Sequence, residues 1–104
     1  MSGGSYNPAD HPHPGEVLLA ELEEIGFSQA GFARYIEVAS DALEAVCSKR
    51  QPMTALLALK IARALGGSPR RWLELQMNHD LVRVSAEQYE NIRPLGEGEG
   101  DSDE

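Results

Sequence analysis

The side chains with the most definite chemistry lie on one short segment that is predicted to be helical, residues 40–47. Asp41 and Glu44 stand about one turn apart there and would share the outward face of the helix. A carboxylate on such a face can accept a hydrogen bond from the N4 amino group of cytosine in the major groove of DNA, although it is repelled by flanking phosphates. We therefore select this face, with Ser40 and Ser48 at its two ends, as a candidate surface for contacts with DNA bases.

Side chains that could hold the DNA backbone flank this segment. Lys49 and Arg50 follow it in a short basic loop that Pro52 closes. Gln29 and Arg34 lie on a preceding segment, residues 29–35, and are also suited to phosphate oxygens. The set of candidate DNA-binding residues is Gln29, Arg34, Ser40, Asp41, Glu44, Ser48, Lys49 and Arg50.

The two segments are predicted to form a helix-turn-helix unit. Their small and apolar residues occur at spacings that let two short helices pack crosswise, and Ser28 is a natural N-cap for the first of them. The turn between them carries Glu37, at a position where glycine would adopt a positive φ more easily. In units of this kind the first helix crosses the DNA backbone, and the second presents its outer face to the major groove.

Three further helices must hold this unit in place. Pro14 and Gly26 delimit the first helix, Thr54 caps a helix over residues 55–65, and Ser68 begins a last one that runs to about residue 84. The fold class is therefore all-α: a five-helix domain without a convincing strand. We expect burial of Leu18, Leu22, Ile25, Ala39, Leu43, Val46, Cys47, Leu57, Ile61, Ala64, Leu65 and Trp72, and one apolar face on the last helix made of Leu73, Met77, Leu81 and Val84.

The composition suits one compact domain with polar ends. The 104 residues are 41% hydrophobic, and the formal net charge is −8. Residues 28–83 nevertheless hold eight basic side chains against five acidic ones, a net charge of +3. We predict a flexible N-terminal tail over residues 1–12, a helix-turn-helix domain over 13–84, a C-terminal extension and possible dimer seam over 85–95, and a disordered acidic tail over 96–104.

Several other classes of function are disfavoured. His11 and His13 are expected to be loop histidines, because no third ligand accompanies them, and we predict no metal and no cofactor. An enzyme is not expected, because the histidines and Cys47 are scattered and form no recognisable nucleophile and base. With one cysteine, no membrane span and no signal peptide in the sequence, we expect a soluble cytoplasmic protein.

Beyond these local patterns, four motifs between residues 13 and 84 match a known family. They are His13-Pro14-Gly15-Glu16, Gly26-x-Ser28-Gln29, Thr54 with Ala58-Leu59-Lys60-Ile61-Ala62-Arg63-Ala64-Leu65-Gly66, and Ser68-Pro69-x-x-Trp72-Leu73-x-Leu75-Gln76 with Asp80-Leu81. On these residues the chain resembles the lambda-repressor-like helix-turn-helix proteins of the XRE family, and within them the HigA-type antitoxins, also called virulence-associated protein I or addiction-module antidotes.

The resemblance implies a homodimeric antitoxin and transcriptional regulator. Such a protein binds a small basic ribonuclease-type toxin and, through its helix-turn-helix, the double-stranded operator DNA of its own operon. The chain departs from the family pattern mainly in the second helix of that unit. The family tends to carry glycine at Glu37, a serine cap at Ala39, polar or basic readers over residues 40–45, and Asn-Gly at Ser48-Lys49.

The sequence is therefore compatible with two functions. The first is a DNA-binding antitoxin that acts as a dimer, with a seam expected around residues 81–95. The alternative is a helix-turn-helix scaffold that no longer reads DNA and uses the acidic face of Asp41 and Glu44 as a protein-interaction module. The sequence also leaves open whether residues 92–95 pair as a strand with a second chain.

Overall fold

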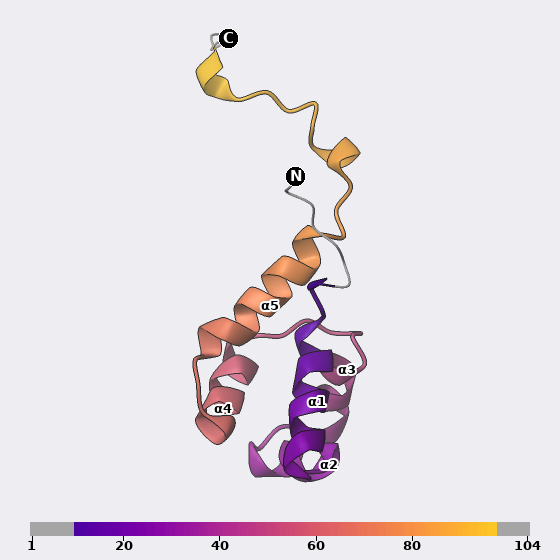
Figure 1. Cartoon of the computed structure of the whole chain (residues 1–104), viewed down its shortest axis with the longest axis vertical. Helices are drawn as coiled ribbons and strands as arrows, with labels where there is room; N and C mark the ends of the chain where they lie inside the picture. Colours follow the sequence, from indigo (N-terminus) through magenta and orange to yellow (C-terminus); the bar gives the residue numbers. More distant parts are fainter. Residues whose placement is uncertain (1–9, 98–104) are drawn as a thin grey trace.

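A computed structural model describes residues 10–97, and this part of the chain folds into five α-helices and two short 3-10 helices without a strand. The five helices are α1 (Pro14–Ile25), α2 (Gln29–Tyr35), α3 (Ser40–Cys47), α4 (Ala55–Leu65) and α5 (Pro69–Leu81), followed by η2 (Ala86–Gln88) and η3 (Leu95–Glu97) (Figure 1). The predicted five-helix, all-α class is confirmed. Most of each predicted tail, residues 1–9 and 98–104, lies outside the described residues.

Three helices begin at the hydroxyl caps that the sequence predicts. The side chains of Ser28, Thr54 and Ser68 each accept a hydrogen bond from a backbone N–H two or three residues further on. A cap of this kind contributes about 1 kcal/mol. The helix α3 lacks such a cap, because Ala39 precedes it. Ala39 was expected to be buried, and this is wrong: as the N-cap it lies outside the helix and is exposed.

Three helices end in the same backbone motif, which sets the direction of the chain on both sides of α3. Gly26, Glu37 and Lys49 follow α1, α2 and α3 with φ angles of 78°, 61° and 71°. After each, the next N–H bonds to the carbonyl five residues earlier, over 2.8–2.9 Å. The strained turn at Glu37 was predicted, whereas the one at Lys49 was not. A side chain in this left-handed region costs roughly 1 kcal/mol.

The core lies where α1, α3, α4 and α5 meet. Leu18, Leu43, Ile61 and Trp72 are among its fully buried side chains, as predicted, and Phe32 of α2 joins them. The helix α3 packs against both α1 and α2, while α4 packs mainly against α5 and α5 reaches back to α1 (Figure 1). The helix-turn-helix unit together with α1 is therefore one half of the molecule, and the α4–α5 pair is the other.

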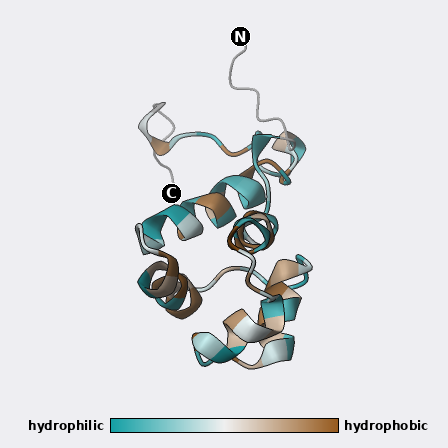
Figure 2. Ribbon diagram, turned by 60° about the horizontal axis from the view of Figure 1, so that its bottom comes forward, coloured by the Kyte–Doolittle hydropathy of each residue, from teal (hydrophilic) through white to brown (hydrophobic). Residues whose placement is uncertain are grey.

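Two predicted buried faces are wrong. Ile25 is 57% exposed, because it is the last residue of α1 and lies beyond the packed part of that helix. The helix α5 turns Trp72 and Gln76 towards the core, so that its opposite apolar face, with Leu73, Met77 and Leu81, is 37–52% exposed. In Figure 2, apolar residues alternate with hydrophilic ones along α5. The same helix ends at Leu81, three residues earlier than expected.

The C-terminal extension also exposes apolar side chains. Val84, Tyr89 and Ile92 are all exposed, and the segment after α5 runs away from the body of the molecule (Figure 1). None of the helices within residues 10–97 combines the length and the apolar character that crossing a membrane requires.

Candidate nucleic-acid interface

The four residues proposed to contact bases share one exposed face of α3. Ser40 and Asp41 lie in its first turn, Glu44 in its second, and Ser48 is the C-cap, all of them exposed. At 100° per residue, the four positions fall within an arc of about 100°. The structure therefore brings these four candidates together on one face, as the sequence predicted.

The opposite face of α3 is packed tightly against α1. Leu43, Val46 and Cys47 are buried, and burial raises the pKa of the Cys47 thiol to about 11. This thiol is therefore protonated at neutral pH and has a packing role. Gly15 of α1 lies so close that a Cβ built on it would stand 2.1 Å from the Val46 carbonyl oxygen. Only glycine fits there, and this contact fixes how far α3 stands from α1.

One of the two acidic candidates on α3 already has a partner. The Arg50 guanidinium forms an ion pair with the Glu44 carboxylate, and Arg50 Nε donates a hydrogen bond to Ser48 Oγ over 3.0 Å. Both charged side chains remain more than half exposed. The charge of Glu44 is therefore balanced from within the chain, which local sequence patterns did not reveal, because Arg50 lies six residues away and beyond the helix end.

The other basic residue of the loop is also paired. Lys49 Nζ lies 2.8 Å from Glu16 Oε2 of α1, and this hydrogen bond is the main cause of the lowered pKa of Glu16. Both partners are about half exposed. Exposed pairs of this kind contribute about 0–1 kcal/mol, so either cation can exchange its carboxylate for a phosphate at little cost.

Asp41 and Arg34 differ from these paired residues. Within the part of the chain that the structure describes, neither side chain makes a hydrogen bond or an ion pair. Arg34 is exposed on α2, and Gln29 is half-buried at the start of that helix. The structure thus leaves one uncommitted carboxylate on α3 and one uncommitted cation on α2.

The turn between α2 and α3 has a support that the sequence analysis missed. Lys60 of α4 donates a hydrogen bond from Nζ to the backbone carbonyl oxygen of Glu37, over 2.9 Å. Glu37 is the residue with the positive φ angle of 61°. This bond joins the α4–α5 half to the turn that orients α3. Lys60 lies 23 residues after Glu37 in the sequence, so no local sequence pattern indicated this contact.

The two N-terminal histidines do not form a metal site in this structure. No group of three or more His, Cys, Asp or Glu side chains within residues 10–97 is placed to hold a metal ion. His13 lies in the loop before α1, as expected, but it is not a solvated loop residue, because its ring is buried and caps α1. Its capping role could have been predicted from its position directly before Pro14, the first residue of a helix.

An exposed second helix behind a tight turn, within a five-helix bundle, defines a lambda-repressor-like helix-turn-helix domain. A comparison with models of known protein families gives no match. Among known protein sequences, the chain is 34% identical over 68 residues to YddM of Escherichia coli K12, described as an uncharacterized HTH-type transcriptional regulator, covering 65% of this chain and 72% of that one.

Solved structures give the same relationship in three dimensions. The antitoxin GraA is 36% identical, with a TM-score of 0.68 over 77% of this chain and 86% of that one. The Pseudomonas aeruginosa antitoxin HigA, solved with the higBA promoter, is 28% identical, with a TM-score of 0.74 over 82% and 98%. The chain belongs to the HigA-type antitoxins of the XRE helix-turn-helix family, which are antitoxins and transcriptional regulators, not enzymes.

Proposed function

We propose that this protein is a homodimeric antitoxin that binds the operator of its own operon through α3 and neutralises a small basic ribonuclease-type toxin. The observation that carries the DNA-binding part is the exposed face of α3, held by α1 and α2 in a helix-turn-helix frame. The Pseudomonas aeruginosa HigA of similar fold, solved with promoter DNA, supports the same use of this frame here.

In the proposed complex, α3 lies in the major groove with the preceding helix across the backbone. Ser40 and Ser48 offer hydroxyl groups, and Asp41 offers an acceptor for a cytosine amino group. Lys49 and Arg50 exchange Glu16 and Glu44 for phosphates, while Gln29 and Arg34 hold the backbone beside α2. Because these cations release counterions when they bind phosphates, DNA affinity should depend strongly on salt.

The dimer is proposed to form through the α4–α5 half. Leu59, Leu73 and Met77 line a shallow groove between these helices, and Leu81 continues the same apolar surface towards the extension over residues 85–95. Exposed apolar side chains gathered in this way are typical of a protein interface. A dimer of this kind would place two α3 helices about 34 Å apart, one turn of DNA. A monomer at micromolar concentration would contradict this geometry.

The proposed toxin partner is supported by charge. The chain has a net charge of −8, and α1 carries four glutamates and no basic residue. A strongly acidic protein attracts a basic partner over a range set by salt, and this raises the association rate more than the final affinity.

The loop cations provide the direct test of DNA binding. Replacing both Lys49 and Arg50 with alanine should weaken binding to the protein's own upstream DNA about tenfold or more at low salt. The slope of log affinity against log salt should fall by about four units, because each protomer of the proposed dimer loses two phosphate contacts. The measurement is a fluorescence anisotropy titration at several salt concentrations. Arg63→Ala, which removes an exposed cation from α4, is the matched control and should change the slope by less than about one unit.

A second candidate function has one observation in its favour. Asp41 has no neutralising partner within the described residues, and both loop cations are bound to carboxylates, which suits a surface for a basic protein. If this second function is correct, the Lys49→Ala/Arg50→Ala variant should bind a basic partner protein with the same affinity as the wild-type protein. Unchanged DNA affinity in the variant would favour this protein-interaction module over the DNA-binding antitoxin.

A further inference from the structure

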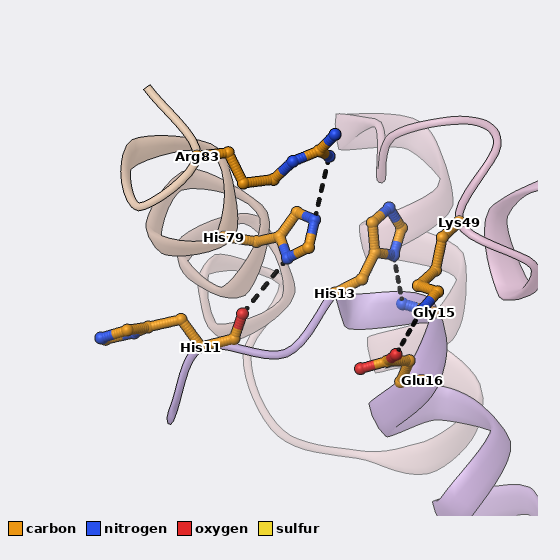
Figure 3. A network of polar contacts seen from close by, with 7 residues as sticks. All are labelled: His11, His13, Gly15, Glu16, Lys49, His79 and Arg83. Atoms are coloured by element: carbon orange, nitrogen blue, oxygen red, sulfur yellow. Dashed lines mark hydrogen bonds and ion pairs between the residues drawn. The ribbon is translucent and has the colours of Figure 1, made fainter. Parts of the chain in front are cut away.

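Two of the three histidines in the chain meet where α1 begins and α5 ends (Figure 3). The rings of His13 and His79 lie edge to face, with their centroids 5.0 Å apart. His13 is only 3% exposed, although the sequence places it in a polar N-terminal segment. This contact joins the first residues of the helix-turn-helix half to the last turn of α5.

The ring of His13 has to be neutral in this arrangement. Its Nδ1 accepts a hydrogen bond from the Gly15 backbone N–H over 2.9 Å, and this bond caps α1. A nitrogen that accepts has no proton, so the ring proton of neutral His13 lies on Nε2. Protonation of Nδ1 would place two N–H groups against each other and remove the cap.

The ring of His79 lies between a hydrogen-bond acceptor and a donor. Its Nδ1 lies 3.2 Å from the backbone carbonyl oxygen of His11, which can only accept a hydrogen bond. Its Nε2 lies 3.3 Å from Nη1 of Arg83, which can only donate. His79 therefore carries its proton on Nδ1, the opposite tautomer to His13. A second proton on Nε2 would face the Arg83 guanidinium (Figure 3).

The charged groups around the pair act in both directions. Glu16 of α1 and Asp80 of α5 favour protonation of His13, although Lys49 is already bound to Glu16. Burial and the neighbouring His79 oppose it and are the larger effects, so the pKa of His13 lies below its ordinary value of 6.5. The unfolded chain consequently takes up a proton at a higher pH than folded His13 does.

We infer that the contact between His13 and His79 is a pH-sensitive attachment of α5, which is stable while both rings are neutral and is released on acidification. Besides the packing of Trp72 in the core, two polar contacts join the rest of α5 to the body of the molecule. Arg71 of α5 pairs with Glu21 of α1 over 2.6 Å, and the side-chain oxygen of Gln76 accepts a hydrogen bond from the Met53 backbone N–H over 2.6 Å.

The histidine pair lies beyond both of these contacts, at the end of α5 that leads into the extension over residues 85–95 (Figure 3). Acidification would therefore loosen this end first. The inference goes beyond the proposed function, because it concerns how the two halves of one chain are joined and does not require DNA or a toxin.

The tautomers provide the first test. A long-range ¹H–¹⁵N correlation spectrum of the full chain at pH 7.5 should show both rings neutral, with His13 protonated on Nε2 and His79 on Nδ1. A charged ring at this pH, or the same tautomer on both, would overturn the inference. This spectrum needs no variant, so it tests the inference even if a substitution prevents folding.

The pH dependence of stability is the second test, measured by urea unfolding followed through the fluorescence of Trp72, the single tryptophan, on α5. Because the pKa of His13 is lowered by folding, its contribution to stability is complete above about pH 6.5 and is lost as the pH falls towards the lowered value. The unfolding constant should rise on acidification from pH 7.5 to 5.5, by up to about tenfold per pH unit for each proton taken up.

Three variants test whether this pH dependence of stability comes from His13 and His79. His13→Asn keeps an acceptor for the Gly15 N–H and cannot titrate, and His79→Gln removes the second ring. Each should flatten the profile. His11→Gln is the matched control: it removes a histidine and keeps the carbonyl that His79 uses, so the wild-type profile should persist. If His13→Asn and His79→Gln keep the wild-type slope, or if His11→Gln flattens it equally, the inference is wrong.

Discussion

The outward faces of α3 and α5 differ in how their side chains are satisfied. On α3 the exposed residues are hydroxyls, alanines and carboxylates, and one carboxylate is neutralised by the neighbouring loop. On α5 the exposed residues include leucines and a methionine, which no described part of the chain covers. A polar face is stable in water and exchanges partners easily, whereas exposed apolar area carries a penalty of about 25 cal/mol per Å². The contrast supports the proposal that α3 contacts DNA and that α5 contacts a protein partner.

The largest expected effect comes from displacing α3 while leaving α5 in place. Gly15→Ala would put a Cβ 2.1 Å from the Val46 carbonyl oxygen, so α1 and α3 would have to move apart. We expect the free energy of unfolding to fall by about 3 kcal/mol, as for other overpacked sites. Urea unfolding followed by Trp72 fluorescence measures this. Gly96→Ala, where a new Cβ meets nothing within 4 Å, is the control. A loss below about 1 kcal/mol would mean that the two helices can separate without strain.

The next effect concerns the apolar face of α5. Met77 is 51% exposed, so Met77→Glu should leave the monomer folded and place a charge in the proposed dimer interface. The dimer dissociation constant should rise about 100-fold, equivalent to about 2.7 kcal/mol. Sedimentation equilibrium measures it. Leu56→Glu, at a more exposed leucine of α4 that lies outside the groove, serves as the control. A Met77→Glu protein that dimerises like the wild type would remove α5 from the interface.

The smallest effect separates the two carboxylates of α3. Asp41→Asn and Glu44→Gln remove the same charge, but only Glu44 is paired. Asp41→Asn should strengthen binding to scrambled DNA about threefold at low salt and lower the ratio of native to scrambled affinity, because a base contact is lost. Glu44→Gln should strengthen binding to both duplexes equally. Anisotropy titrations of both variants measure the ratios. If the ratio of native to scrambled affinity is identical in the two variants, Asp41 does not contact bases.

What the sequence revealed about the fold follows from local chemistry. Ser28, Thr54 and Ser68 cap helices through bonds to residues two or three positions away, and Gly26 ends α1 through its own backbone freedom. These signals lie within one turn of the features that they determine, so the bounds of α1 to α4 were predictable. The same holds for the strained turn at Glu37.

What the sequence did not reveal depends on contacts between distant residues. The pairs Lys49–Glu16 and His13–His79 join positions far apart in the chain, so no local pattern indicates them. The face of α5 that is buried could not be predicted for a different reason. Its sequence offers apolar residues on more than one side, and only its packing against α1 and α4 selects Trp72 for the core. The candidate face of α3 was predictable because one side of that helix alone is apolar.

We propose that α3 reads DNA. The most direct measurement is a salt titration of binding to the protein's own upstream DNA, compared with a scrambled duplex of equal length. We expect a preference for the native duplex and a log–log salt slope of several units, because Lys49, Arg50 and their neighbours hold phosphates while α3 contacts bases. Equal affinity for both duplexes, or no binding at low salt, would contradict it and would leave α3 as a surface for a protein partner.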